Sequence, residues 1–124
     1  QEPASKQAAL RRWLSEDFSK KNPAIYKKIY SILNKNNHKD FLKCYEIFVN
    51  YVDDDDMLKK ISVKSLIVTG ENDVGSTPVM SKNLSKMIQG SKFIEIKTGK
   101  HLCSIECADD VNIALKEFID QHND

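Results

Sequence analysis

The stretch VKSLIVTG, residues 63–70, is a short run of β-branched and aliphatic residues that ends at a glycine. Such a run predicts a buried strand. Residues 77–90 predict a helix opened by Thr77-Pro78 and ended by Gly90, and residues 93–96 predict a second strand. A last helix follows. The residues expected on one face of the first helix are Met80, Leu84, Met87 and Ile88. The residues expected to face inward in the last helix are Val111, Ala114, Leu115, Phe118 and Ile119.

This order of strand, helix, strand and helix predicts an α/β fold with parallel strands joined by a right-handed crossover. Two parallel strands cannot bury both of their faces alone, since parallel sheets are normally wider and covered on both sides. We therefore expect an incomplete sheet whose missing strands precede Gln1. The exposed flank of the first strand then invites pairing with another chain.

The residues ahead of these strands predict a helical segment instead. Three short helices are expected, with apolar side chains at helical spacing. Asn22 is placed to cap the second helix with Pro23 at its first position, and residues 34–37 separate the second helix from the third. We divide the chain into a helical covering segment, residues 1–60, and a strand–helix–strand–helix unit, residues 61–124. The apolar stripes are Ala8, Leu10, Trp13, Leu14 and Phe18, then Tyr26, Ile29, Tyr30 and Leu33, then Phe41, Cys44, Tyr45 and Phe48.

Composition excludes several classes of function. The 124 residues carry 19 Lys and Arg against 18 Asp and Glu, so no general field attracts nucleic acid or anionic lipid. No apolar run approaches the roughly 20 residues of a membrane span. Three cysteines are an odd number, which excludes a complete internal disulfide framework and favours a reduced compartment. With no signal peptide visible, we expect a cytoplasmic protein, and the start at Gln1 hints at truncation.

Two loops carry residues suited to catalysis. Asp73 follows the first predicted strand, and His101 follows the second. Catalytic groups of open α/β sheets gather at the carboxyl ends of the strands, so these side chains are expected to approach each other. A carboxylate beside a histidine is the acid–base half of a nucleophile–His–acid triad. Taken singly, either residue is more simply a turn former or a polar loop residue.

Residues 63–119 resemble the C-terminal part of an α/β-hydrolase. SLIVTGENDVGSTPVMSKNLSKMI looks like that family's strand, acid loop and helix, and FIEIKTGKHLCSIECADDVNIALKEFI looks like its last strand, histidine loop and closing helix. Asp73 precedes His101, as the family's triad order requires. RRWLSEDF, NPAIY and CYEIFVNYVDDDDMLKKI look like the cap of the 3-oxoadipate enol-lactonase branch. The nucleophile is missing, because none of the four glycines forms a Gly-x-Ser-x-Gly elbow.

The resemblance implies a fragment of a serine hydrolase that acts on a small ester or lactone, with a serine upstream of Gln1 and no metal or organic cofactor. His101 would act as general base and acid, and Asp73 would orient it. Trp13 and Arg12 are candidates for substrate binding, since Arg suits carboxylates, although an exposed basic turn beside a core Trp is the simpler interpretation. Val74 and Leu102 are further candidates. This chain alone is then inactive, and its partner is the N-terminal part of the same hydrolase.

Other interpretations stay open. The missing nucleophile also fits a non-catalytic module that binds a partner or self-associates. The run Asp53 to Asp56 is either a cation site or, more simply, an acidic loop and first helical turn. His101, Cys103 and Cys107 have metal-ligating side chains, but packing and a helix start explain the cysteines more simply. His38 and His122 are expected to be solvated.

Overall fold

The computed structural model describes residues 4–52 and 54–122. Its sheet has two parallel strands, β1 (Leu66–Gly70) and β2 (Lys92–Ile96), paired in register from Leu66 opposite Lys92 to Gly70 opposite Ile96. The predicted incomplete α/β sheet is therefore confirmed. The first strand is shorter than its sequence run, since residues 63–65 precede it, although the Ser65 carbonyl still accepts the Lys92 N–H at 2.9 Å.

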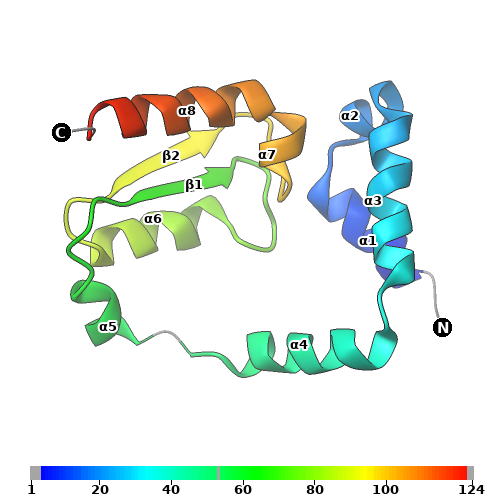
Figure 1. The fold of residues 1–124 in the computed structure, drawn as a ribbon, viewed down its shortest axis with the longest axis horizontal. Coiled ribbons are helices and arrows are strands. Elements are labelled where there is room, and N and C mark those ends of the chain that lie inside the picture. The colour runs from blue at the N-terminus through cyan, green and yellow to red at the C-terminus, as the bar shows by residue number, and fades with distance from the viewer. Residues whose placement is uncertain (1–3, 53, 123–124) are drawn as a thin grey trace.

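Helices α6 (Pro78–Met87) and α8 (Ala108–Asp120) cover opposite faces of this sheet (Figure 1). The start of α6 is as predicted, because Pro78 is its first residue and the Thr77 hydroxyl accepts the Met80 backbone N–H. A four-residue helix that the sequence did not predict, α7 (Cys103–Glu106), precedes α8. Gly90 lies beyond the end of α6 with φ of 75°, the left-handed turn that glycine favours.

The core between sheet and helices is small. Ile96, Cys103 and Val111 are buried, and Val68, Ile94 and Cys107 pack against them. The prediction of a buried first strand is wrong for its apolar half, because Leu66, Ile67 and Val68 are only half-buried. It is also wrong that Leu115 and Ile119 face inward, since they are 43% and 52% exposed. Two strands present too little surface to cover both helices.

The helical segment forms five helices: α1 (Ala4–Trp13), α2 (Glu16–Lys21), α3 (Pro23–Lys35), α4 (His38–Asn50) and α5 (Asp55–Lys59). The single first helix expected from the sequence is two, because the Ser15 hydroxyl accepts the Phe18 N–H and starts α2 anew. Asn22 stands at the cap position of α3, but its side chain donates to the Phe18 carbonyl instead of capping.

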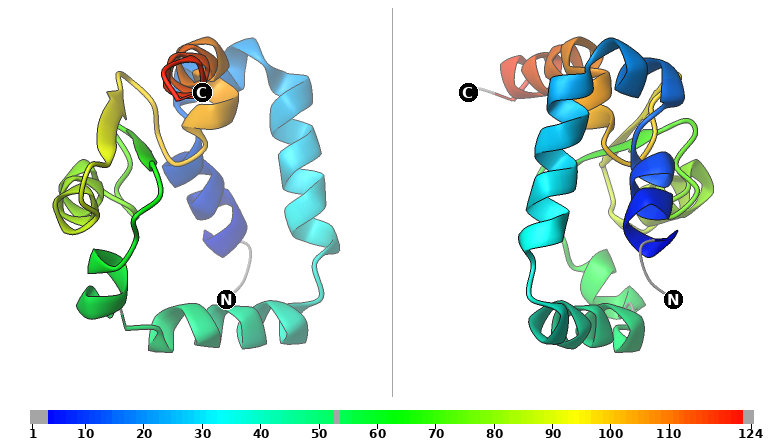
Figure 2. Two further views of the ribbon diagram at one scale, coloured as in Figure 1. Left: turned by 60° about the vertical axis from the view of Figure 1, so that its left-hand side comes forward. Right: turned by 90° about the vertical axis from the view of Figure 1, so that its right-hand side faces the viewer.

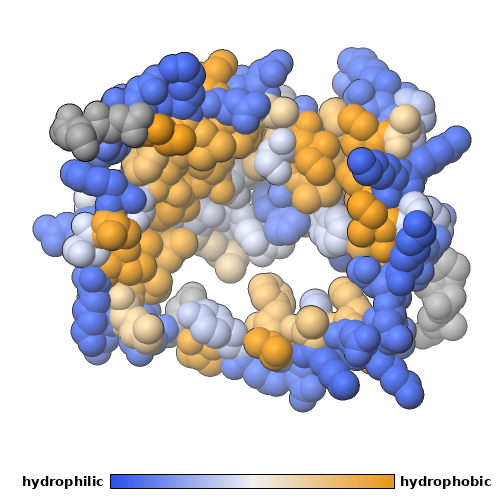
Figure 3. Space-filling view, viewed as in Figure 1, coloured by the Kyte–Doolittle hydropathy of each residue, from blue (hydrophilic) through white to orange (hydrophobic). Residues whose placement is uncertain are grey.

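These helices surround an open centre with the βα unit. α4 spans the side opposite α8, and α5 leads from it back to β1 (Figure 1; Figure 2). Figure 3 shows apolar surface bordering the hollow between α4 and the rest. Every residue of α4 is exposed, whereas Leu10 and Leu14 at the α1–α2 junction are fully buried. Among these helices, the fully buried apolar side chains therefore lie at the α1–α2 junction and not in α4.

The acidic run supplies a helix cap. Asp53 lies outside the described residues, but Asp54 accepts the N–H groups of Asp56 and Met57 and so starts α5. Within residues 4–52 and 54–122, no three His, Cys, Asp or Glu side chains are grouped to hold a metal ion. None of the helices in this described part has the length and apolar character to cross a membrane.

Candidate active site

The two loops that end β1 and β2 are hydrogen-bonded to each other. The N–H of Glu71 donates to the Ile96 carbonyl at 2.9 Å, and the N–H of Asn72 donates to the Gly99 carbonyl at 2.8 Å. Gly70 permits this contact, since a Cβ there would lie 2.4 Å from the carbonyl oxygens of both Gly99 and Lys100. The carboxyl ends of the strands thus form one rigid platform.

Asp73 is held by this platform and is only 6% exposed. Its Oδ1 accepts the N–H groups of Gly75 at 2.8 Å and Ser76 at 2.9 Å. Burial on its own raises the pKa of this carboxyl, but the hydrogen bonds from Ser76, His101 and Gly75 outweigh burial, so its pKa lies below the usual range. The carboxylate is therefore ionised at neutral pH, and its second oxygen, Oδ2, faces His101.

His101 contacts Asp73 directly, with 2.8 Å between Nδ1 and Oδ2. An ionised carboxylate only accepts hydrogen bonds, so Nδ1 carries the proton and Nε2 is left unprotonated in the neutral ring. The His101 side chain is 42% exposed against 6% for Asp73. A buried acid behind a half-exposed histidine leaves Nε2 available to take a proton from another group.

A cavity of about 540 Å³ lies beside His101, between the βα unit and the helical segment that precedes it. Trp13 lines it, with its ring centroid 6.1 Å from that of His101, and Arg12 lines it as well. The sequence missed the wall that α4 contributes, where Phe41, Tyr45 and Phe48 stack in sequence along one side. The full lining is Lys6, Ala9, Arg12, Trp13, Leu33, Asn36, His38, Phe41, Tyr45, Phe48, Gly75, Ser76 and His101.

Two further candidates lie apart from this cavity. Val74 is 67% exposed and is not among the described lining residues. Leu102 is half-buried, and its N–H donates to the Trp13 carbonyl at 2.9 Å, so it contacts the end of α1. Of the histidines expected to be solvated, His122 is exposed beside the Phe118 carbonyl, whereas the exposed His38 also lines the cavity.

The cysteines of the His-x-Cys-x3-Cys cluster have structural positions. Cys103 is buried at the start of α7, and Cys107 precedes α8 with its thiol 3.8 Å from the Lys97 carbonyl. Burial raises the pKa of both thiols, which keeps them protonated. His101 turns its Nδ1 toward Asp73. Packing of the thiols and their positions at the starts of α7 and α8 account for the two cysteines.

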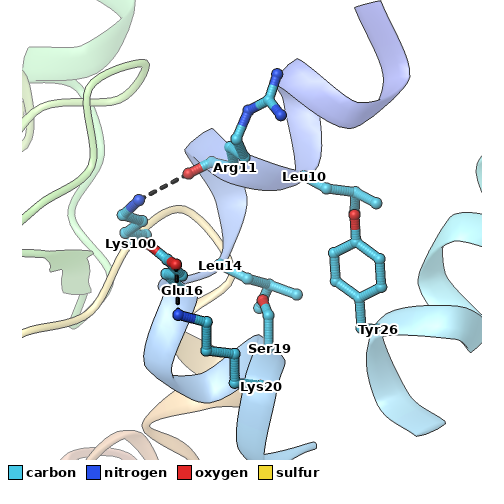
Figure 4. Close-up of a pocket in the computed structure, with 8 residues that line it drawn as sticks. All are labelled: Leu10, Arg11, Leu14, Glu16, Ser19, Lys20, Tyr26 and Lys100. Carbon is cyan, nitrogen blue, oxygen red and sulfur yellow. Dashed lines mark hydrogen bonds and ion pairs between the residues drawn. The ribbon is translucent and has the colours of Figure 1, made fainter. Parts of the chain in front are cut away.

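A second cavity, of about 440 Å³, lies on the other side of Lys100 and contains neither Asp73 nor His101 (Figure 4). The Lys100 ammonium donates to the Arg11 carbonyl at its edge, and Lys20 pairs with Glu16 at 2.6 Å. This side of the histidine loop is therefore bonded to α1.

Topology, strand register and the strand-end loops together define the C-terminal part of an α/β-hydrolase fold. The enol-lactonase from Burkholderia xenovorans LB400 superposes with a TM-score of 0.86 at 23% identity, over 94% of this chain and 44% of that one. Est816, described as an N-acyl homoserine lactone degrading enzyme, superposes with a TM-score of 0.73 at 22% identity, over 94% of this chain and 52% of that one.

The sequence is also similar to curated proteins. The proline iminopeptidase of Lactobacillus helveticus strain DPC 4571 is 33% identical over 69 residues, which are 56% of this chain and 23% of that protein, and a second L. helveticus proline iminopeptidase matches equally. No family model matches the chain. The chain thus spans about a quarter of the curated relatives it matches and about half of the similar structures.

Proposed function

We propose that this chain supplies the acid and the histidine of a serine-hydrolase triad, in a protein that cleaves an ester or lactone. One observation carries the proposal: the half-exposed His101 is paired through Nδ1 with a buried, ionised Asp73 and borders a 540 Å³ cavity. The nucleophile belongs to a segment outside these 124 residues, since the sequence holds no Gly-x-Ser-x-Gly elbow.

In the proposed reaction, Nε2 of His101 takes the proton of the serine hydroxyl as its oxygen attacks the carbonyl carbon. Asp73 keeps the ring in the correct tautomer and stabilises the imidazolium. The protonated ring gives its proton to the leaving alkoxide or enolate oxygen. Water then hydrolyses the acyl-enzyme: Nε2 takes a proton from the attacking water and returns it to the serine oxygen as the acyl–oxygen bond breaks. The steps as written use no metal or organic cofactor.

The cavity supports an anionic substrate. Lys6 and Arg12 are the charged side chains of its described lining, which includes neither Asp nor Glu. The remaining wall is largely aromatic and aliphatic. A lactone that carries a carboxylate matches this chemistry, because Arg pairs well with carboxylates. Two superposed proteins are named for lactones, which supports the lactone part of this proposal. We propose a substrate most like 3-oxoadipate enol-lactone.

The proposed partner is the remaining part of the same hydrolase. β1 pairs only with β2 in the described sheet, so its other edge is open for a further strand. Several apolar side chains of α6 and α8 are exposed, among them Val79, Met80, Ile113 and Leu115. A segment that supplies the other strands would cover them. The same surface favours a second candidate function, a non-catalytic module that self-associates through this edge.

His101→Ala in the protein that contains the nucleophile tests the first proposal. We expect kcat to fall by about 10²–10⁴, the usual contribution of a general base. A fall well under tenfold would sink the assignment. Sedimentation of the 124-residue chain at several concentrations tests the second candidate: a strictly monomeric, cooperatively melting species counts against self-association.

A further inference from the structure

Glu106, the last residue of α7, joins two segments that are distant in the sequence. One carboxylate oxygen accepts the N–H of Ser15 at 2.8 Å, and the other accepts the N–H of Lys100. Ser15 separates α1 from α2 and follows the cavity residues Arg12 and Trp13. Lys100 directly precedes His101. One half-buried side chain therefore touches the backbone next to the substrate cavity and the backbone next to the catalytic histidine.

Neighbouring contacts show that the histidine loop holds the end of α1 at several points. The last carbonyls of a helix lack partners within it. Here the Lys100 ammonium donates to the Arg11 carbonyl at 2.7 Å, and the Leu102 N–H donates to the Trp13 carbonyl at 2.9 Å (Figure 4 shows the former). Glu106 adds the next contact along the chain, at Ser15.

We propose that Glu106 is a positioning residue that fixes the histidine loop to the substrate-contacting end of α1. This inference rests on the proposed function, since it gives Glu106 a role through His101. Among the contacts of the described residues that join the histidine loop to this region, only the Glu106 carboxylate bonds the backbones of both Ser15 and Lys100. Movement at Arg12 and Trp13 is then transmitted to Lys100, and from there to the adjacent His101.

The geometry distinguishes Glu106 from an ordinary surface carboxylate. Both oxygens accept backbone N–H groups, so Glu106→Gln leaves one N–H facing an amide NH₂ group. The protein keeps its shape but loses one charge-assisted bond and weakens the other. Exposed Glu117 on α8 provides a matched control, because Glu117→Gln makes the same chemical change away from both segments.

NMR on the ¹⁵N-labelled 124-residue chain is the test. In Glu106→Gln we expect the Ser15 and Lys100 amides to exchange with solvent at least about tenfold faster, which corresponds to a loss of roughly 1.5 kcal/mol. The Nδ1 proton of His101 should exchange faster by a comparable factor, and Glu117→Gln should change neither. A purely structural role would speed the two amides and leave the His101 ring as in the wild type, and this result overturns the proposal. Unchanged amides overturn it as well.

A second variant covers the case in which Glu106→Gln does not fold. Glu106→Asp keeps the charge but shortens the reach by one methylene, so it loses one of the two bonds. Faster exchange at the His101 ring supports the proposal, and a wild-type ring contradicts it. None of these measurements needs a nucleophile. An active His101→Ala enzyme would therefore refute the proposed function and leave the exchange measurements unchanged. A wild-type His101 ring in Glu106→Gln would refute the positioning role of Glu106 and leave the proposed function untouched.

Discussion

Replacing Asp73 by Asn should invert the tautomer of His101. In the native pair, the carboxylate Oδ2 accepts the Nδ1 proton at 2.8 Å. In Asp73→Asn, Oδ1 can still accept the N–H groups of Gly75 and Ser76, which leaves the amide NH₂ group facing His101. Nδ1 must then accept, so the proton moves to Nε2, the nitrogen that the proposed mechanism needs free.

The magnitude follows from the bond that is lost. A hydrogen bond to a charged group contributes roughly 1.5–3 kcal/mol. At about 1.4 kcal/mol per factor of ten, the tautomer ratio should shift by about 10- to 150-fold against the Nδ1–H form. In the enzyme with its nucleophile, an Asp-to-Asn change at a triad of this kind has lowered kcat about 10⁴-fold, and a loss of that order is expected here.

The assay is a long-range ¹H–¹⁵N spectrum of the neutral His101 ring, in which protonated and unprotonated nitrogens have distinct shifts. Asp109→Asn, an exposed change on α8, is the control and should leave the ring unaltered. If His101 keeps its proton on Nδ1 in a folded Asp73→Asn protein, the carboxylate does not set the tautomer and the reasoning fails.

Three further predictions concern stability and substrate. The lowered pKa of Asp73 means that its contribution to the free energy of unfolding is complete above its ordinary pKa of 3.8 and is lost as the pH falls through the lower, folded value. Denaturant melts across this range should show the decline in the wild type. A parallel decline in Asp73→Asn would contradict this assignment. Gly70→Ala should destabilise the protein by about 1–3 kcal/mol, because its Cβ would lie 2.4 Å from backbone oxygens. Gly75→Ala is the control and should melt close to the wild type, since the nearest atom to its Cβ, Asp73 Oδ1, lies at 3.6 Å. Equal melting temperatures for the two variants would rule out the tight contact at Gly70. Arg12→Gln should raise KM for a carboxylated lactone by about tenfold and change KM for a neutral lactone little, since one charge-assisted bond is lost. Arg11 lines the other cavity, so Arg11→Gln should leave both KM values unchanged. An equal rise in KM for both substrates in Arg12→Gln would exclude a role in binding the carboxylate.

The local patterns predicted the βα unit well, because each element carried its own signal. Thr77-Pro78 marked the start of α6, and a β-branched run marked β1. The meeting of Asp73 and His101 followed from a general rule, since adjacent parallel strands end at the same edge of the sheet. The structure places them at hydrogen-bond distance.

What the sequence left out depends on contacts between distant segments. Ser15 ends one helix and starts another, but the apolar spacing from Leu14 to Phe18 suggested a continuous helix. Val74 and Leu102 are adjacent in sequence to Asp73 and His101, yet neither is among the described residues that line the cavity. The stripe Phe41, Tyr45 and Phe48 indicated a covering face without saying what it covers. Glu106 gave no signal, because its partners lie 91 and 6 residues away.

Active-site labelling would show whether His101 activates a serine nucleophile. A fluorophosphonate ester reacts with a serine only when that serine is activated, so the nucleophile-containing protein should be labelled once per molecule. His101→Ala should slow this labelling by about 100-fold or more, in line with the loss of a general base. The 124-residue chain alone should stay unlabelled. Equal labelling rates for the wild type and His101→Ala, or a labelled residue within these 124, would contradict the account.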